Sequence, residues 1–205
     1  MCVGVAIALK AHYIPSIYQI NRFGNRITES RLKTGYSIKN VSIFITYSPN
    51  TLSGQGGLGK YRNDIDTTIK NAPNNVIKIW RADNNGPVAR TASNRNSIGK
   101  WAIIEKTDKG NGVNIVQKCI ENDMARRNAY FIPKNNDKQN LATWNSYYGA
   151  IAGEIGFCII QRKYGNWAIN VPIGKYANPS QATRREMLKI GLRIKLGNLL
   201  LRGKW

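Results

Sequence analysis

Short apolar segments of strand length recur along this chain, and each one ends at a polar or proline-containing turn. Between Val41 and Tyr47 (VSIFITY) every second residue is apolar or aromatic, which is typical of a strand, and Pro49 stops the pattern. IGFCII is a continuous apolar run and indicates a central strand. We predict strands at Val3–Leu9, Val41–Tyr47, Val76–Trp80, Ile155–Ile160 and Leu188–Leu196.

Two stretches between these segments have helical periodicity instead. Tyr61, Ile65 and Ile69 are spaced four residues apart, so we predict an amphipathic helix at Lys60–Asn71. A second helix is predicted at Asn111–Asn122. The glycine-rich stretch Ser53–Gly59 lacks the spacing of a phosphate-binding loop and is interpreted as a flexible connection. We find no repeat or domain linker, and the pattern indicates one α+β domain over residues 1–205.

The charge of the chain is strongly unbalanced. Its 31 Lys and Arg exceed its 11 Asp and Glu and give a formal net charge of +20. Residues 161–205 alone hold ten Lys or Arg and one acid, Glu186. Such a run can be a solvated face, but in a chain this basic it favours contact with a polyanion, most often nucleic acid.

The cysteine and histidine content excludes several kinds of site. Cys2, Cys119 and Cys158 are far apart and odd in number, which argues against a disulfide framework or a zinc site and favours an intracellular, reducing compartment. His12 is the single histidine, so any site that needs two histidines is excluded. No apolar run approaches the length of a membrane span, and we expect no membrane partner.

Several motifs, read in order, resemble the endonuclease/exonuclease/phosphatase superfamily. Within it, they resemble the endonuclease domains of LINE-type retrotransposons and the craniofacial development protein 2-like proteins derived from them. In the first half of the chain, the matches are GVAIAL at Gly4–Leu9, YSPN at Tyr47–Asn50, and IKIWRADNNG at Ile77–Gly86, which corresponds to a family strand ending in GDFNA. Shorter matches follow at Ile98–Lys100, at Asn111-Gly112 and at Ala142–Trp144 (ATW). The last two are EIGFCII at Glu154–Ile160, which corresponds to QIDYIL, and Ser180–Ala182, which stands where the family has SDH.

The resemblance implies a four-layer α/β sandwich, in which two mixed sheets pack face to face with helices outside. It also implies hydrolysis of phosphodiesters with Mg²⁺. In the family an Asp–His pair acts on the water, carboxylates hold the metal, and a D-x-N pair positions water and phosphate.

This chain departs from the family pattern at the residues that carry the chemistry. Gly156 stands where the family has the Asp that orients its histidine, the histidine itself is replaced by Ala182, and the carboxylate before it by Gln181. The family's first two strands, which carry an Asn and a metal-binding Glu, have no match here. We therefore expect no resident cofactor and no metal site, because Mg²⁺ prefers carboxylate oxygens that are missing.

The resemblance leaves three catalytic candidates and three candidates for binding nucleic acid. Tyr47, Asp83 and Asn85 match the family's phosphate- and water-positioning groups. Alternatively, Asp83 and Asn85 cap a turn and Tyr47 is an ordinary sheet residue. Trp144, in a turn beside the family's groove, could stack on a base or belong to the core. The last two candidates, Arg184 and Arg185, follow the lost SDH position and would bring positive charge to the groove.

Three hypotheses about function follow. The first is a catalytically inactive endonuclease-like domain of retroelement origin that binds RNA or DNA backbone, with a ribonucleoprotein such as a ribosome as one natural setting. The second is an active Mg²⁺-dependent retrotransposon endonuclease, which Gly156 and Ala182 argue against. The third is a decaying retroelement fragment. A fold that lacks two family strands would expose sheet edges, so we also expect protein partners to cover them.

Overall fold

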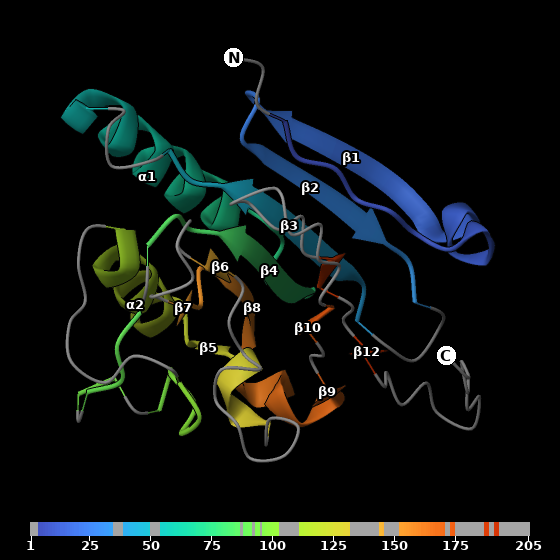
Figure 1. Cartoon of the computed structure of the whole chain (residues 1–205). Coiled ribbons are helices and arrows are strands. Elements are labelled where there is room, and N and C mark those ends of the chain that lie inside the picture. The colour runs from blue at the N-terminus through green and yellow to red at the C-terminus, as the bar shows by residue number, and fades with distance from the viewer. Residues whose placement is uncertain are drawn as a thin grey trace.

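A mixed six-stranded sheet forms the centre of the computed structural model (Figure 1). The structure describes residues 4–34, 39–49, 54–86, 88–91, 93–94, 96–102, 111–131, 144–145, 152–170, 173–174, 187–188 and 191–192. The strand order is β1-β2-β3-β4-β8-β5, where only β3 and β4 run parallel and all other neighbours are antiparallel. The strands are β1 (Ile17–Phe23), β2 (Ile27–Leu32), β3 (Val41–Tyr47), β4 (Ile77–Asp83), β5 (Met124–Arg126) and β8 (Gly156–Gln161).

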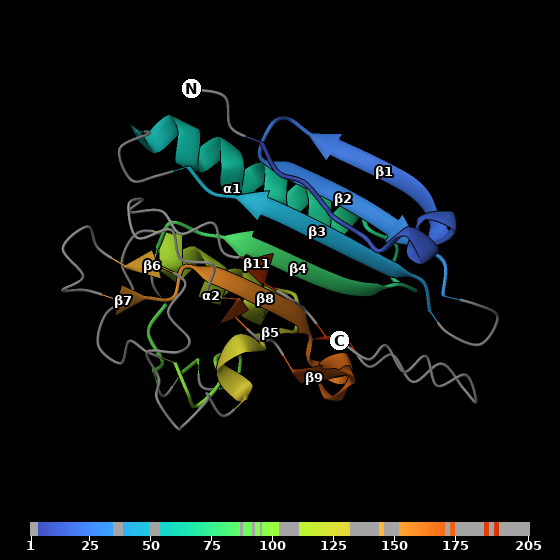
Figure 2. The same cartoon turned by 45° about the vertical axis from the view of Figure 1, so that its right-hand side comes forward.

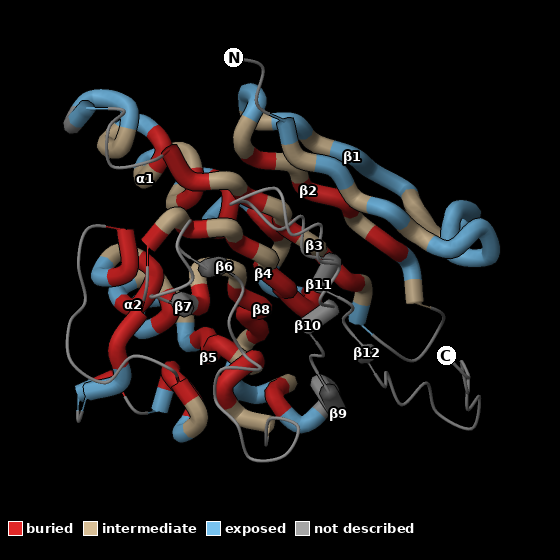
Figure 3. Tube along the Cα trace, in the orientation of Figure 1, coloured by how far each residue is buried: buried red, intermediate tan, exposed pale blue. Residues whose placement is uncertain are grey.

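Two helices, α1 (Gly54–Asn71) and α2 (Asn111–Glu121), cover one face of this sheet. Their apolar stripes bury Tyr61, Ile65 and Ile69 of α1 and Ile115 and Cys119 of α2. These side chains form one core with sheet residues that include Phe44, Trp80, Phe157 and Ile159. Figure 3 shows this buried layer between the helices and strands β3, β4 and β8.

The opposite face of the sheet has a smaller core. Val41, Ile77, Ile79 and Ile160 lie there, with Ile43 and Tyr164 packed against them. The remaining described strands form two-residue pairs: β6 (Trp144–Asn145) with β7 (Ala152–Gly153), β9 (Ala168–Asn170) with β12 (Gly191–Leu192), and β10 (Ile173–Gly174) with β11 (Met187–Leu188). Short 3-10 helices are η1 (Ala11–Ser16), η3 (Asn128–Tyr130) and η6 (Arg162–Trp167).

The structure confirms the predicted α+β class and the strands and helices with strong periodicity. The predicted strand 41–47 is β3, and those at 76–80 and 155–160 are β4 and β8, each within three residues at either end. The helix predicted at 111–122 is α2. Of the predicted strand 188–196, the structure describes Leu188, which ends β11, and Gly191–Leu192, which form β12, so these residues belong to two separate strands.

Two predictions from the N-terminal half were wrong. Residues 4–10 are extended but belong to no strand, and they run beside β2 in both Figures 1 and 2. Val5, Ile7 and Leu9 are half-buried and the residues between them are exposed. The segment is not a strand because, among the described residues, no strand pairs with it. The glycine-rich stretch is not a loop from Gly54 onward but the first turns of α1, where the packing of the later apolar stripe outweighs the low helix propensity of glycine.

Strands β1 and β2 were not predicted. They form an antiparallel hairpin whose turn contains Gly24 at φ +67°, a left-handed conformation that glycine adopts without steric cost. Both strands carry polar residues on both faces, so the alternation that marks the inner strands is weak. This hairpin forms one edge of the sheet (Figure 2).

Candidate functional site

The register of the sheet brings three of the predicted site positions into one row. Tyr47, the last residue of β3, is paired with Asp83, the last residue of β4. Asp83 is in turn paired with Gly156, the first residue of β8. Residues paired in register project to the same face, so this row lies at one end of the sheet on the face opposite α1 and α2.

Asp83 is held in place by the turn that follows it. The backbone N–H of Asn85 donates to Asp83 Oδ1 at 3.2 Å, and Asn85 Nδ2 donates to the carbonyl of Ser48 at 2.7 Å. Asn85 has a left-handed backbone, φ 46°, which asparagine tolerates better than most residues. The D-x-N pair therefore caps the end of β4, as the turn interpretation of the sequence expects.

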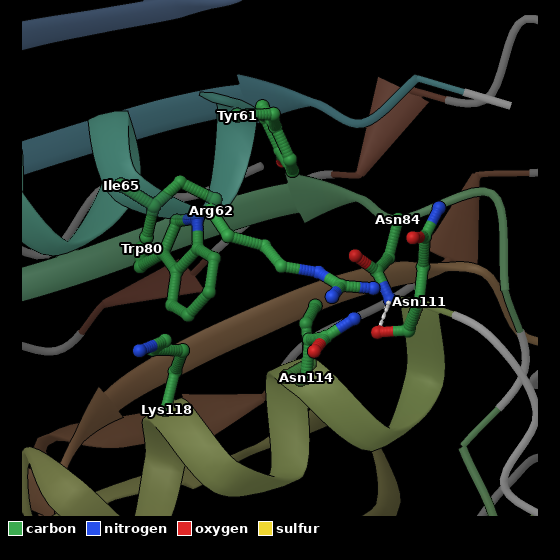
Figure 4. Close-up of a pocket in the computed structure, with 9 residues that line it drawn as sticks. Tyr61, Arg62, Ile65, Trp80, Asn84, Asn111, Asn114 and Lys118 are labelled. Carbon is green, nitrogen blue, oxygen red and sulfur yellow. Dashed lines mark hydrogen bonds between the residues drawn. The ribbon is translucent and has the colours of Figure 1, made fainter. Parts of the chain in front are cut away.

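A buried amide network ties this turn to α2 and to the turn after β3. Asn111 Nδ2 donates to Ser48 Oγ at 2.8 Å and to the Pro49 carbonyl at 2.9 Å. Asn84 Nδ2 donates to the Asn111 carbonyl at 2.6 Å, the bond drawn in Figure 4. The network fixes the positions of Tyr47 and Asp83 relative to each other. From the sequence, Asn111 was expected only as part of a motif, and the role of Ser48 was not predicted.

Two arginines flank the row. Arg81 lies two residues before Asp83 on the same face of β4, paired with Cys158 of β8. Burial lowers the pKa of Arg81, while the neighbouring Cys158 and Asp83 raise it in part. At the other side, Arg26 Cζ lies 5.5 Å from the centroid of the Tyr47 ring. An arginine between Trp80 and Ala82, in a strand that leads to a candidate site residue, is the sequence signal that could have identified Arg81.

The ionisation of the groups in the row is set mainly by burial. Burial raises the pKa of Asp83, and the Asn85 N–H and the Arg81 guanidinium lower it in part. Burial also raises the pKa of the Cys158 thiol to about 12, so that thiol is protonated near neutral pH and is no nucleophile.

The donor set at the row does not fit Mg²⁺. Asp83 is its single carboxylate, and one of its oxygens already accepts a backbone hydrogen bond. Gly156 has no side chain, and Arg81 places a positive charge beside the carboxylate. In the part of the chain that the structure describes, no group of three His, Cys, Asp or Glu side chains comes together to hold a metal ion. We therefore derive no step through a metal here.

The other predicted site residues are only partly placed. Trp144 lies in the short strand β6, paired with Gly153 of β7, and not in a turn as expected. Backbone pairing with β7 replaces the expected turn, and β7 leads within three residues to Gly156. Gln181, Ala182, Arg184 and Arg185 fall outside the described residues. His12 lies in η1, and its ring contacts that of Tyr13, with centroids 4.1 Å apart and the ring planes tilted by 49°.

A groove between α1 and α2 was not predicted. It is lined by Arg62, Asn84, Asn114 and Lys118, together with apolar side chains of the core. Figure 4 shows Arg62 reaching from α1 across towards Asn84 and the start of α2. Lys118 is ion-paired with Asp66 at 2.6 Å and Glu121 at 3.0 Å, so part of its charge is neutralised within the protein.

The sheet and the two helices that cover it have the fold of solved endonuclease and exonuclease domains, in agreement with the fold that the motifs imply. The solved endonuclease domain of TRAS1, a telomere-specific non-LTR retrotransposon, is similar with a TM-score of 0.53 and 11% identity, covering 86% of this chain and 69% of that one. The 3'-5' exonuclease NExo from Neisseria meningitidis has a TM-score of 0.51 at 10% identity, covering 79% of this chain and 63% of its own.

A third structure, the 3' phosphatase NExo from Neisseria bound to a product DNA hairpin, has a TM-score of 0.50 at 10% identity. It covers 82% of this chain, and this chain spans 65% of it. No family model and no curated protein matches the sequence. The similarity therefore establishes the fold, and the chain spans about two thirds of these neighbours.

The described part of the chain contains no helix long and apolar enough to cross a membrane.

Proposed function

We propose that this chain is a domain of the endonuclease/exonuclease/phosphatase fold that binds the backbone of nucleic acid without hydrolysing it. The observation that supports the proposal is the row formed by Tyr47, Asp83 and Gly156. The sheet register makes these three predicted positions neighbours, but they hold one carboxylate, whose oxygen caps a turn, and Arg81 lies beside it where a metal site would need further carboxylates.

The charge of the chain supports binding of a polyanion. A net charge of +20 on 205 residues attracts phosphate backbones at long range, and each phosphate contact by Lys or Arg releases counterions. Arg26 and Arg81 flank the row and would meet a phosphate that enters it. Trp144, Arg184 and Arg185 stay predictions for the same surface.

We extend the proposal to a ribonucleoprotein setting and a retroelement origin. The ordered motifs support the origin, and a basic domain without a metal-binding carboxylate cluster among its described residues suits a structural role on RNA. Protein partners at the sheet edges also stay a prediction.

A plasmid assay with Asp83→Asn tests the proposal. Supercoiled plasmid is incubated with Mg²⁺ and either the wild-type chain or the variant, and nicking and gel shifts are both scored. We expect no nicking by either protein, and shifts that weaken steeply between about 50 and 200 mM salt. Nicking by the wild type that Asp83→Asn abolishes would show a working nuclease and refute the proposal.

Asp123→Asn is the matched control, because it removes the same charge at an exposed position far along the chain from the row. The Asp123 side chain is 66% exposed and pairs with Arg162. Both variants should bind plasmid at least as well as the wild type, since each removes one negative charge. Absence of any salt-sensitive shift would refute the binding half of the proposal independently of nicking.

A further inference from the structure

A concentration of exposed apolar and aromatic side chains lies at the opposite end of the sheet from the row. Six large hydrophobic residues are exposed in the described part of the chain, and four of them lie in the eight-residue stretch 13–20, which belongs to η1 and β1. These are Tyr13 (38%), Ile14 (56%), Tyr18 (40%) and Ile20 (57%). Figure 3 shows η1 and much of β1 as exposed. We call these four residues, with His12, Lys10, Arg22 and Lys33, the β1 patch.

The backbone presents Tyr18 outward. The register between β1 and β2 shifts between Ile17 and Gln19, so Tyr18 is the residue at an irregularity of the edge strand. Such bulges re-aim a side chain away from the regular ladder. The Lys33 ammonium lies 6.0 Å from the centroid of the Tyr18 ring, at the edge of the cation–π range.

Within residues 4–34, the described segment that carries these rings, every exposed charge is positive. Lys10, Arg22 and Lys33 are exposed. The single acid between residues 4 and 34 is Glu29, which is 1% exposed and accepts hydrogen bonds from Arg31, Asn21 and Ser42. Exposed aromatic rings among cations with no exposed acid fit a phosphate-linked chain of unpaired bases.

The β1 patch is separate from the row. The strand β1 runs away from η1, and its far end at Phe23 leads into the turn whose Arg26 carbonyl accepts from the N–H of Tyr47. Phe23 lies five positions after Tyr18 along this extended strand, a span of about 17 Å. A single strand of several nucleotides could therefore contact the patch alone or continue along β1 towards the row.

We infer that the β1 patch binds single-stranded nucleic acid, with bases stacked on Tyr13 and Tyr18 and phosphates near Lys10, Arg22 and Lys33. This inference rests on the proposed function, because it specifies the form of nucleic acid and the surface that holds it. Like-charged copies of the chain would repel each other here, which disfavours the patch as a contact between two copies.

Fluorescence anisotropy with two labelled RNA probes tests the inference. One probe is single-stranded oligouridine of about 12 nucleotides, and the other is a duplex of the same length. Tyr13→Ala/Tyr18→Ala should weaken binding of the single strand at least about tenfold and leave duplex binding unchanged, because only unpaired bases can stack. Tyr13→Phe/Tyr18→Phe keeps both rings and should bind as the wild type does.

The salt dependence separates stacking from charge. The alanine variant removes no charge, so its slope of log affinity against log salt should equal that of the wild type. Lys33→Ala should lower the magnitude of that slope by about 0.7 on the single strand. The three positions changed in these variants, Tyr13, Tyr18 and Lys33, are exposed, and unchanged circular dichroism and melting temperature would confirm that the fold is intact.

Three results would overturn the inference. They are a single-strand affinity unchanged in the alanine variant, an equal loss on both probes, and sedimentation that shows a dimer broken by the same substitutions. If the wild type binds neither probe, the proposed function fails as well. If the wild type binds and the alanine variant matches it, this inference alone fails.

Discussion

The amide of Asn111 offers the sharpest test of how the row is held. Its Nδ2 bonds to Ser48 Oγ and to the Pro49 carbonyl at 2.8 and 2.9 Å, and both Asn111 and Ser48 are buried, at 3% and 0% exposure. Asn111→Ala removes both bonds. With a net contribution of about 1 kcal/mol for each bond and a further cost for acceptors left buried, we expect a loss of about 2–3 kcal/mol in the free energy of unfolding.

A double-mutant cycle isolates the contact between the two side chains. Ser48→Ala removes the bond to Asn111 and the bond of Ser48 Oγ to the Pro49 carbonyl, so we expect a loss of about 1–2 kcal/mol. The double variant should lose about 1 kcal/mol less than the sum of the single losses, because the shared bond is counted twice in that sum.

Urea unfolding followed by circular dichroism measures all three variants, and an unchanged m value shows that the unfolded state is comparable. Asn63→Ala, on the exposed side of α1, is the control and should change stability by no more than about 0.5 kcal/mol in the stabilising direction. A loss below about 0.5 kcal/mol for Asn111→Ala, or a coupling energy near zero, would refute the network as the element that fixes the row.

Three further predictions concern stability. Gly56→Ala, whose new Cβ on α1 meets open space, should stabilise the fold by about 0.5–1 kcal/mol. Gly99→Ala should destabilise the fold by about 1–3 kcal/mol, because its new Cβ would collide with the backbone of Ala129. Equal urea midpoints for the two variants would contradict this contrast. Burial raises the pKa of Glu154 from 4.5 to about 6, so the folded chain keeps a proton that the unfolded chain releases between these pH values. The contribution of this proton to the free energy of unfolding is therefore complete below pH 4.5 and is lost as the pH rises through 6, a fall of about 2 kcal/mol in all. Stability measured from pH 4 to 7 should show this fall in the wild type and not in Glu154→Gln, and parallel profiles would contradict it. Lys78→Met should lower the melting temperature, since the buried ammonium donates at 2.8 Å to a carbonyl in the last turn of α1, and an unchanged melting temperature would show that this bond is dispensable.

The sequence predicts the inner elements of the fold because their burial leaves a periodic pattern. Strands β3, β4 and β8 have neighbours on both sides, and each is rich in apolar residues, which recur at every second position in β3 and are continuous in most of β8. The hairpin of β1 and β2 is at the sheet edge, where Gln19, Asn21 and Arg22 are accommodated without a complete core, so no such pattern arises. The Gly24-Asn25 turn between two half-polar runs was the available signal for this hairpin.

For the site, the motifs identify residues but not their arrangement. Tyr47, Asp83 and Gly156 come from three separate motifs, and only the register of β3, β4 and β8 shows that they are neighbours. That same register places Arg81 beside Asp83, so a residue that the motif comparison did not single out changes the charge of the row.

The proposed function combines loss of catalysis with retention of binding, and the two arginines at the row give a physical reason for that combination. A metal ion holds phosphate through its charge but needs several carboxylates around it, and each carboxylate would repel the substrate once the metal is absent. With glycine at position 156, the row carries one partly buried carboxylate whose charge burial disfavours. A fixed guanidinium at Arg81 then attracts phosphate directly. Arg81→Ala should therefore weaken duplex binding and reduce the magnitude of its slope of log affinity against log salt by about 0.9. The same substitution should leave stacking of bases on the β1 patch unchanged.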